Sequence, residues 1–526
     1  MLDIIIRNGK IIDGSGNPWY SADIAVDAGQ IVEIGRVNSK AKETIDAAGN
    51  IVCPGFIDMH AHPDLTLFYK EVQDYKLRQG VTTEVGGNCG FTAAPLYPKT
   101  SEQLKKFMAF ITPPTGVDWG WSTFKEYLQK VSDSSPATNL VPLVGHGTVR
   151  IAVMGVQQRA PTQNELSEME MLVDEAMEAG AYGISTGLVY VPGNYAETEE
   201  IVALAKIAAR HGGIYATHMR DEGENLINSV EETIAICQGA DIAVQISHHK
   251  AAGKLNHGKV IESLGVIQNA RNSGLDVTID QYPYSASSTT LQAILPPWSQ
   301  EGGVEKIVER LQDNEIRSEI QNQLLNSHGE TRMGGVLDEI LITEVKSHKN
   351  KVCVGKTLKQ LSDLRNQESI DVALDLLIEE ECAVGMVNFS MSEDDVKTVM
   401  QSPVTMIGSD GLYQVGNPHP RVYGTYPRVL GKYVREDEVL SLETAVRKMT
   451  GFPSQKLGLH KKGLLRVGFD ADLVVLDPTI VKDQATFLDS RQYPVGIDYV
   501  IVNGQIAVAD GQFTGTTAGV VVSKNR

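Results

Sequence analysis

Residues 140–218 contain three short runs of mostly apolar residues, LVPLV (140–144), YGIST (182–186) and IYATH (214–218). The segments between these runs are longer and have helical periodicity. In the first of them, Thr162 and Glu165 have the spacing of a helix-capping box. Apolar residues that we expect in the core follow at helical spacing, namely Leu166, Met169, Val173 and Met177. Short strands that alternate with amphipathic helices predict βα units around a parallel sheet.

The same alternation continues through IAVQISH (242–248) and LDVTIDQY (275–282). Because the chain has 526 residues and a bare barrel needs roughly 250, we expect additional domains. The predicted fold class is α/β, with a (β/α)₈ barrel over residues 53–454. Residues 286–350 interrupt the pattern with a Pro-Pro-Trp turn (296–298) and polar helical sequence. They are expected to form an inserted subdomain near the barrel mouth, either a lid or a surface excursion without catalytic role.

The two ends of the chain differ from this body. They combine alternating strand patterns with the turn dipeptides Asn-Gly at 8–9, Asp-Gly at 13–14 and Asn-Gly at 503–504. ADIAVDAGQIVEIG near the start and YVIVNGQIAV near the end have a similar character. We therefore expect residues 1–52 and 455–526 to fold together as one small discontinuous β-sandwich.

Composition limits the classes of partner. A formal net charge of −19 disfavours binding to the phosphate backbone, so no nucleic-acid partner is expected. No apolar run approaches the ~20 residues that span a bilayer, so no membrane association is expected either. Five cysteines are an odd number, widely spaced in a large chain, and the start lacks the pattern of a secretory signal. These features predict a reducing, cytoplasmic location.

Potential metal ligands stand where barrel strands should end, which is where barrel enzymes place their active sites. The strand pattern VCPGFIDMHAH (52–62) puts His60 and His62 on one face, although two such histidines alone are a weak signal. Cys89 lies in the glycine-rich turn GGNCG (86–90), which gives its thiol little packing. Further candidates are His146, His218, His248, His249 and Asp410. These residue types are zinc ligands.

Some of these residues have an equally simple structural interpretation. Cys53, Cys237, Cys353 and Cys382 are expected in the core. Neighbouring residues on a strand point to opposite faces, so only one of His248 and His249 can face the barrel axis while the strand continues. His146 and His249 are expected to be supporting or structural residues.

Seven motifs together resemble the N-acyl-D-amino-acid deacylases (D-aminoacylases) of the amidohydrolase superfamily, and the resemblance spans nearly the whole chain. They are GFIDMHAH (55–62), GVTTEVGGNCG (80–90), YATHMRDEG (215–223), ISHHK (246–250), DQYPYSAS (280–287), IGSDG (407–411) and HPRVYGTYPRVLGKYV (419–434). Many superfamily members bridge two metals with a carboxylated lysine near the end of the fourth strand. AYGISTGLVY (181–190) offers no lysine there. In this family a cysteine from an earlier strand takes its place, and Cys89 matches that position.

The resemblance implies a Zn²⁺-dependent hydrolase of N-acyl-D-amino acids, small molecules that are cleaved to a carboxylate and a free D-amino acid. It implies one tightly bound zinc on Cys89, His218 and His248, and a weaker second metal position on His60, His62 and Asp410. Asp410 would be the general base. Lys250, Arg421 and Tyr282 would hold the substrate carboxylate, with Tyr190 and Ser288 as additional pocket residues.

Alternatives remain at this stage. Lys250 could be a solvated charge, Arg421 a loop ion pair, and Tyr190 and Ser288 packing residues. At the level of function, the rivals are a ring-opening cyclic amidohydrolase of the dihydroorotase or hydantoinase kind and a non-catalytic scaffold on the same fold. The residues indicate neither the preferred side chain nor the acyl group nor the oligomeric state, and the preferred hand follows from the resemblance alone.

Overall fold

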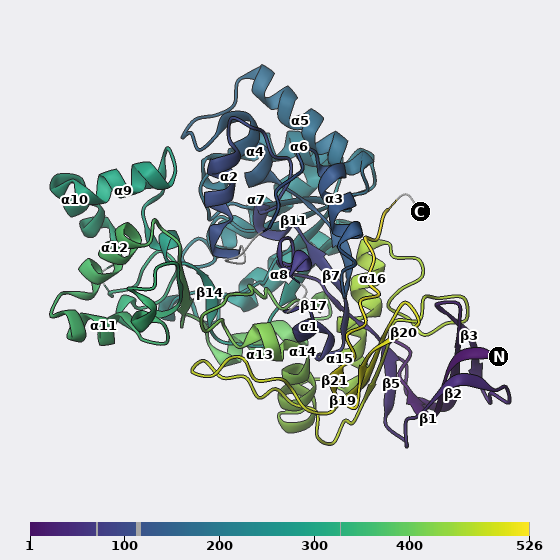
Figure 1. Ribbon diagram of the computed structural model, residues 1–526. Coiled ribbons are helices and arrows are strands. Elements are labelled where there is room, and N and C mark those ends of the chain that lie inside the picture. Colours follow the sequence, from purple (N-terminus) through teal and green to yellow (C-terminus); the bar gives the residue numbers. More distant parts are fainter. Residues whose placement is uncertain (70–71, 112–116, 327, 525–526) are drawn as a thin grey trace.

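The computed structural model describes residues 1–69, 72–111, 117–326 and 328–524. Figure 1 shows three regions: a central body of strands and helices, a strand-rich side that contains the purple N-terminal and yellow C-terminal segments, and a teal-green side that carries α9 (Val304–Gln312) and α10 (Asn314–Leu324). The candidate site lies in the central body.

The central body is a closed barrel of parallel strands. One sheet joins β17-β13-β12-β11-β10-β9, and another joins β6-β7-β8. Only Leu143 separates β8 from β9, so these two fill one position, and Ala61 pairs with Gly411 where β6 and β17 close the ring. Within the described residues the barrel therefore has eight strand positions, which confirms the predicted fold class. The bounds are β6 (Phe56–Asp58), β7 (Val81–Gly86), β8 (Asn139–Pro142), β9 (Val144–Gly145), β10 (Gly183–Gly187), β11 (Ile214–His218), β12 (Ala243–Ile246), β13 (Val277–Gln281) and β17 (Thr405–Ile407).

Helices cover the outside of the barrel (Figure 1). Thr162 and Glu165 form the predicted capping box at the start of α5, and Met169 and Met177 are buried in the core. The helices of this body are α1 (Asp74–Leu77), α2 (Ser101–Phe107), α3 (Phe124–Asp133), α4 (His146–Met154), α5 (Gln163–Glu178), α6 (Thr198–Arg210), α7 (Leu226–Ala240), α8 (Lys259–Asn272), α13 (Glu393–Gln401), α14 (Arg421–Arg428), α15 (Leu442–Met449) and α16 (Gly451–Leu457).

Strands from both ends of the chain form one sheet, in which β5 lies between β18 and β1. Isoleucines of the N-terminal strands pack with Leu473, Val475 and Ile501 of the C-terminal ones in a shared apolar core. Gly55 links β5 to β6 of the barrel, and a Cβ there would lie 2.2 Å from Thr82 Oγ1, so only glycine fits this crossing. The strands are β1 (Leu2–Ile11), β2 (Tyr20–Asp27), β3 (Gln30–Gly35), β4 (Ala41–Asp46), β5 (Ile51–Pro54), β18 (Leu473–Leu476), β19 (Ile497–Val502), β20 (Gln505–Ala509) and β21 (Gln512–Phe513).

The inserted region has a sheet and an apolar core of its own. Its strands pair antiparallel in the order β14-β16-β15, and helices α9 to α12 pack around them. Its elements extend to residue 388, further than the interval 286–350 considered from the sequence, because β16 is the central strand of this sheet. The remaining bounds are β14 (Ser287–Thr290), β15 (Leu341–Val345), β16 (Val384–Asn388), α11 (Leu358–Arg365) and α12 (Ser369–Glu379).

All five cysteines are free and buried, as expected for residues outside any disulfide framework. None of the helices in the described residues is both long and apolar enough to cross a bilayer.

Candidate metal centre

Six predicted ligand residues come together at the carboxyl ends of the barrel strands, and all are buried, with exposed fractions of 8% or less. We call them the metal cluster. They are His60 and His62 after β6, Cys89 after β7, His218 at the end of β11, His248 after β12 and Asp410 after β17. The two histidines of the first motif lie just beyond β6, which ends at Asp58, rather than within a continuing strand.

Cys89 Sγ lies 3.6 Å from His248 Nε2 and 3.7 Å from His218 Nδ1. Tetrahedral zinc, with bonds of about 2.3 Å to sulfur and about 2.0–2.1 Å to nitrogen, separates two such ligand atoms by about 3.6 Å. Each distance fits two ligands of one zinc ion. The ligand group that contains Cys89 and has all its atoms within 4.8 Å of one another consists of His60, Cys89 and His248. His60 Nε2 lies closer to the sulfur still, at 3.3 Å.

The turn that carries Cys89 depends on close backbone approaches. Cys89 has φ 55°, in the left-handed region that is unfavourable for a residue with a Cβ. A Cβ on Gly187, the last residue of β10, would lie 2.2 Å from the Cys89 carbonyl oxygen. Glycine at the end of β10 thus lets the cysteine turn lie directly over the strand where other superfamily members were expected to carry a lysine.

A second donor group adjoins the first. Asp410 Oδ1 lies 3.2 Å from His62 Nε2 and 3.6 Å from His60 Nε2, and the ligand atoms of these three residues are all within 4.8 Å of one another. Because His60 also contacts Cys89, it lies between the two groups that the resemblance separates. The donor types and spacing fit two neighbouring cations.

The two adjacent histidines point to different places, although β12 ends at Ile246 and strand alternation therefore does not apply to them. His248 has φ 35° and directs Nε2 at Cys89. His249 Nε2 lies 2.8 Å from Ser263 Oγ in the outer helix α8. Only His248 belongs to the metal cluster.

Glu222 is a functional candidate that the sequence did not single out. Its Oε1 lies 3.0 Å from His248 Nδ1 and 2.6 Å from Lys250 Nζ, and its Oε2 lies 3.4 Å from His218 Nε2. It therefore orients two candidate zinc ligands through their outer ring nitrogens, a common arrangement at zinc sites. A carboxylate four residues after a histidine at a strand end was the available signal.

Electrostatics favour the anionic forms of Cys89 and Asp410, whereas the same surroundings raise the pKa of His60, His62 and His218 toward the charged form, which does not bind a metal. Burial opposes ionisation of Cys89, but charged His60 and hydrogen bonds from His218 and His248 lower the pKa of its thiol well below the usual range. Burial also opposes ionisation of Asp410, yet Arg421 and His62 hold its pKa well below the ordinary value. Both groups are therefore anionic at neutral pH, the state required for metal binding.

The three predicted carboxylate-binding residues lie beside the cluster. Arg421 is fully buried, and its NH1 lies 2.9 Å from Asp410 Oδ2. The Arg421 guanidinium also lies 4.6 Å from the centre of the Tyr282 ring, and the buried Tyr282 hydroxyl has no hydrogen-bond partner. Lys250 is buried and paired with Glu222, so its interpretation as a solvated charge is wrong.

The two additional pocket residues occupy different places. Tyr190 stacks its ring edge-on against His218, with centroids 4.9 Å apart, and its hydroxyl lies 2.9 Å from Thr289 Oγ1. Ser288 lies in β14, and its carbonyl oxygen accepts a hydrogen bond from Arg421 NH2 at 3.0 Å. The inserted region therefore contributes directly to this end of the barrel.

Another buried group of charges lies directly below the metal cluster. Asp58 Oδ1 accepts hydrogen bonds from the backbone N–H groups of Ser409 and His60, at 2.8 Å and 3.3 Å, and Asp58 Oδ2 accepts from Ser409 Oγ at 2.6 Å. Lys76 donates to Asp58 and to Ser409 Oγ and lies 3.6 Å from Glu84. We call Asp58, Lys76, Glu84 and Ser409 the Lys76 cluster.

His146 belongs to neither group described above. Its Nε2 lies 2.8 Å from Glu200 Oε1, and Arg150 pairs with the other oxygen of the same carboxylate. All three side chains are buried. The structure thus agrees with the expectation that His146 is a structural residue.

The chain is similar to known proteins over nearly its whole length. The family model described as the amidohydrolase family matches residues 43–508. The chain is 38% identical to a D-aminoacylase of Alcaligenes xylosoxydans xylosoxydans over 99% of this chain and 98% of that protein. It is 37% identical to an N-acyl-D-aspartate deacylase of the same organism, over 98% and 93% of the respective chains. A crystal structure of an N-acyl-D-glutamate deacylase from Bordetella bronchiseptica, complexed with zinc and a phosphonate inhibitor that mimics the tetrahedral intermediate, matches with TM-score 0.84, 35% identity and 99% coverage of both chains.

Proposed function

Because the chain belongs to the amidohydrolase family, within the group of D-aminoacylases and related deacylases, we propose that it hydrolyses the amide bond of N-acyl-D-amino acids. The products would be a carboxylate and a free D-amino acid. The observation that carries this proposal is the buried Cys89 sulfur at zinc-ligand separations from His218 and His248. Cationic side chains lie beside it, as a substrate with a free carboxylate requires.

Cys89, His218 and His248 would hold the tightly bound zinc, and His60, His62 and Asp410 a weaker second cation. Zinc supplies Lewis-acid polarisation of the scissile carbonyl and a lowered pKa for water. Glu222 fixes the ring orientations of two of these histidines. The chain would thus provide a complete inner ligand set with second-layer support.

Asp410 would move the proton. Its carboxylate is anionic at neutral pH, so an oxygen atom of it can accept the proton of the attacking water. The same group can return that proton to the leaving nitrogen as the amide C–N bond breaks. Arg421 forms an ion pair with Asp410, with NH1 2.9 Å from Oδ2, and Oδ1 is directed at His60 and His62.

Arg421, Lys250 and Tyr282 would bind the α-carboxylate of the substrate. Arginine offers a planar fork for a carboxylate, lysine a point charge, and the unpaired Tyr282 hydroxyl a hydrogen-bond donor. Arg421 and Lys250 are now paired with Asp410 and Glu222. A bound substrate carboxylate would therefore share Arg421 with Asp410 and Lys250 with Glu222, instead of pairing with unpaired cations.

Two rival functions fit less well. A cyclic amidohydrolase of the hydantoinase or dihydroorotase kind was expected to carry a lysine at the end of β10, where this chain has Gly187 beneath the Cys89 turn. A non-catalytic scaffold has no need of a buried thiol among imidazoles, nor of a strained backbone that presents it. Linear N-acyl amino acids are therefore the favoured substrates.

The direct test uses zinc-loaded protein, metal analysis, and three substrates: N-acetyl-D-methionine, its L-isomer and dihydroorotate. We expect bound zinc and release of D-methionine from the first compound only. The matched variant Asp410→Asn should keep the tight zinc and lose about 10²–10⁴-fold in kcat, the usual contribution of a general base. Preference for the L-isomer or for dihydroorotate, or full activity of the variant, would contradict the proposal.

A further inference from the structure

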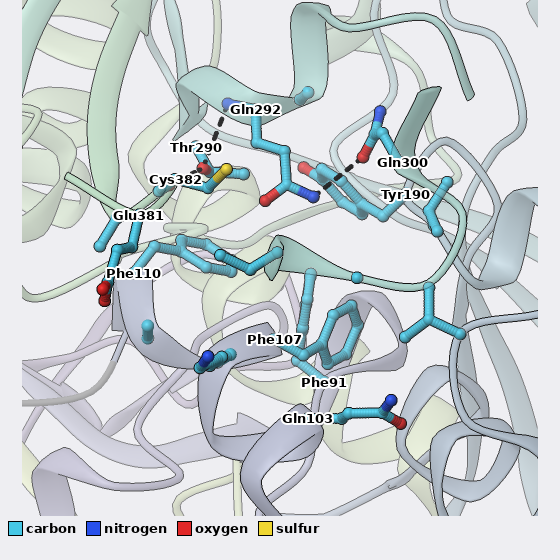
Figure 2. Close-up of a pocket in the computed structure, with 18 of the residues that line it drawn as sticks. Phe91, Gln103, Phe107, Phe110, Tyr190, Thr290, Gln292, Gln300, Glu381 and Cys382 are labelled. Carbon is cyan, nitrogen blue, oxygen red and sulfur yellow. Dashed lines mark hydrogen bonds between the residues drawn. The ribbon is translucent and has the colours of Figure 1, made fainter. Parts of the chain in front are cut away.

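A pocket lies between the barrel and the inserted region (Figure 2). Figure 2 shows Phe91, Phe107 and Phe110 on its barrel side and Gln292 and Gln300 on the side of the inserted region. Aliphatic residues complete much of the lining, namely Val156, Val189, Val191, Ala293 and Val304. The wall is thus mainly apolar and aromatic, as in pockets that take hydrocarbon groups.

The charged side chains at this pocket already have partners, whereas the amide oxygen of Gln103, which also lines it, has no hydrogen-bond partner among the described residues. Lys106 pairs with Glu305, and Glu381 pairs with Lys346 at 2.9 Å. Gln292 Nε2 donates to Gln300 Oε1 at 2.9 Å, which Figure 2 marks with a dashed line. No charged side chain among these is free to bind an ionic ligand, so an uncharged apolar ligand fits best.

Two aromatic rings adjoin both the pocket and the metal cluster. The Phe91 and Tyr190 rings lie 5.2 Å apart and both line the pocket. On their other side, Phe91 contacts the His62 ring at 6.3 Å and Tyr190 contacts the His218 ring at 4.9 Å. The pocket therefore adjoins the metal end of the site.

Strand β14 links the pocket to the carboxylate-binding end as well. The Ser288 carbonyl holds Arg421, and Thr290 of the same strand lines the pocket. Two residues along a strand advance by roughly 6.5–7 Å. A substrate held by its carboxylate at Arg421 is therefore within reach of the pocket.

We propose that this pocket binds the acyl chain of the substrate, so that the enzyme prefers N-acyl groups longer than acetyl. The inference rests on the proposed function. With the carboxylate at Arg421, Lys250 and Tyr282 and the scissile carbonyl at the metal cluster, two substituents remain to be placed. The amino-acid side chain is attached next to the carboxylate, whereas the acyl chain is attached at the carbonyl. None of Arg421, Lys250 and Tyr282 lines the pocket, and both of its inner rings contact candidate metal ligands. The acyl chain is the substituent at that end.

The first experiment measures kcat/KM of zinc-loaded protein for N-acetyl-, N-butyryl- and N-hexanoyl-D-methionine. Burial of each added methylene should raise kcat/KM by up to about fourfold. A flat or falling series would overturn the inference while leaving the proposed function intact, provided the acetyl compound is hydrolysed. Failure to hydrolyse any compound of the series would instead count against the proposed function itself.

The second experiment fills the pocket. Ala383 lines it and is half-buried, so Ala383→Trp places an indole there at modest cost to folding. We expect kcat/KM for the hexanoyl substrate, divided by kcat/KM for the acetyl substrate, to fall by about tenfold or more. The reason is that the indole prevents burial of two to three methylenes of the longer chain. Ala203→Trp is the matched control, the same change at a half-buried alanine of α6 outside this pocket, and should leave the ratio unchanged.

A second variant guards against a folding defect. Val304→Asp puts a carboxylate at the first residue of α9, a favourable place for an acidic side chain in a helix but an unfavourable one beside an acyl chain. It should lower the same ratio. If either variant alters the preference between D-methionine and D-alanine with the acetyl group fixed, while the acyl series stays as in the wild type, the pocket binds the side chain and the inference is wrong.

Discussion

The metal cluster and the Lys76 cluster are both buried and charged, and they are neighbours in the chain, because Asp58 of one precedes His60 of the other by two residues. They differ in how their polar atoms are paired. In the Lys76 cluster, both Asp58 oxygens, the Lys76 ammonium and the Ser409 hydroxyl are hydrogen-bonded. Glu84 Oε2, 3.6 Å from Lys76 Nζ, lacks a hydrogen bond within the described residues. In the metal cluster, the outer ring nitrogens of His60 and His218 have only long contacts with carboxylates, 3.5 Å from Asp280 and 3.4 Å from Glu222. Nδ1 of His62 has no hydrogen-bond partner among the described residues.

The backbone differs in the same sense. Cys89, His248 and Asp410 of the metal cluster all have positive φ, between 35° and 55°. No member of the Lys76 cluster does among the described residues. Strained backbone is costly and persists where a ligand or reaction requires it. We therefore expect the Lys76 cluster to maintain the barrel and the metal cluster to be arranged for a bound cation.

The largest effect on zinc binding and activity is expected from Cys89→Ala, which tests whether the two clusters have different roles. Loss of the thiolate should remove the tight zinc and lower kcat/KM by more than about 100-fold, because even second-layer residues of metal sites contribute 10–100-fold. Folding should survive, since the cluster does not support the barrel. Zinc content, activity and thermal unfolding would be measured together.

Cys237→Ala is the matched control for that experiment. Cys237 is also buried, but it lies in the outer helix α7, where its thiol donates to the Ile242 carbonyl oxygen at 3.0 Å. It should keep zinc and activity. A Cys89→Ala protein that retains both would refute the ligand assignment.

Lys76→Met should instead lower the stability of the fold and leave zinc binding intact. The change leaves Asp58 and Glu84 as buried carboxylates without their cation, which should cost about 3–5 kcal/mol of folding free energy. The molecules that remain folded should still bind zinc. Urea denaturation gives the free energy, and zinc per folded molecule gives the second quantity.

Lys306→Met provides the reference value, because it removes an exposed pair with Glu309 that should be worth less than about 1 kcal/mol. If Lys76→Met were as mild as this surface change, or if it released zinc without loss of stability, the two clusters would not have the separate roles assigned here.

The sequence predicted the parts of this arrangement that depend on local pattern. Strand periodicity located the barrel strands, and the capping box located the start of α5. The ligand positions after strands followed from the barrel rule. What it missed depends on distant contacts: Glu222 acts through side chains of two other strand ends, and β16 joins the inserted sheet from beyond residue 350. Tertiary pairing of this kind leaves little trace in local spacing.

The smallest effect is expected from His249, which follows the candidate ligand His248 and faces away from the metal cluster. Its pKa contrasts with that of His218, which belongs to the cluster. Burial opposes the charged form of both, but the Glu222 carboxylate and the Cys89 sulfur raise the pKa of His218 to about 9, whereas the pKa of His249 falls to about 4. His249 therefore binds its proton less readily in the folded state than at its unfolded pKa of about 6.5. Its contribution to stability is complete above about pH 6.5 and is lost as the pH falls toward 4, up to about 3 kcal/mol.

The variant His249→Gln remains neutral and can still bond to Ser263. Between pH 6.5 and 4, metal-free wild-type protein should therefore lose more unfolding free energy than this variant, as measured by urea denaturation. If the unfolding free energies of the wild type and the variant changed equally with pH, His249 would be charged in the folded protein, and its lowered pKa would be wrong.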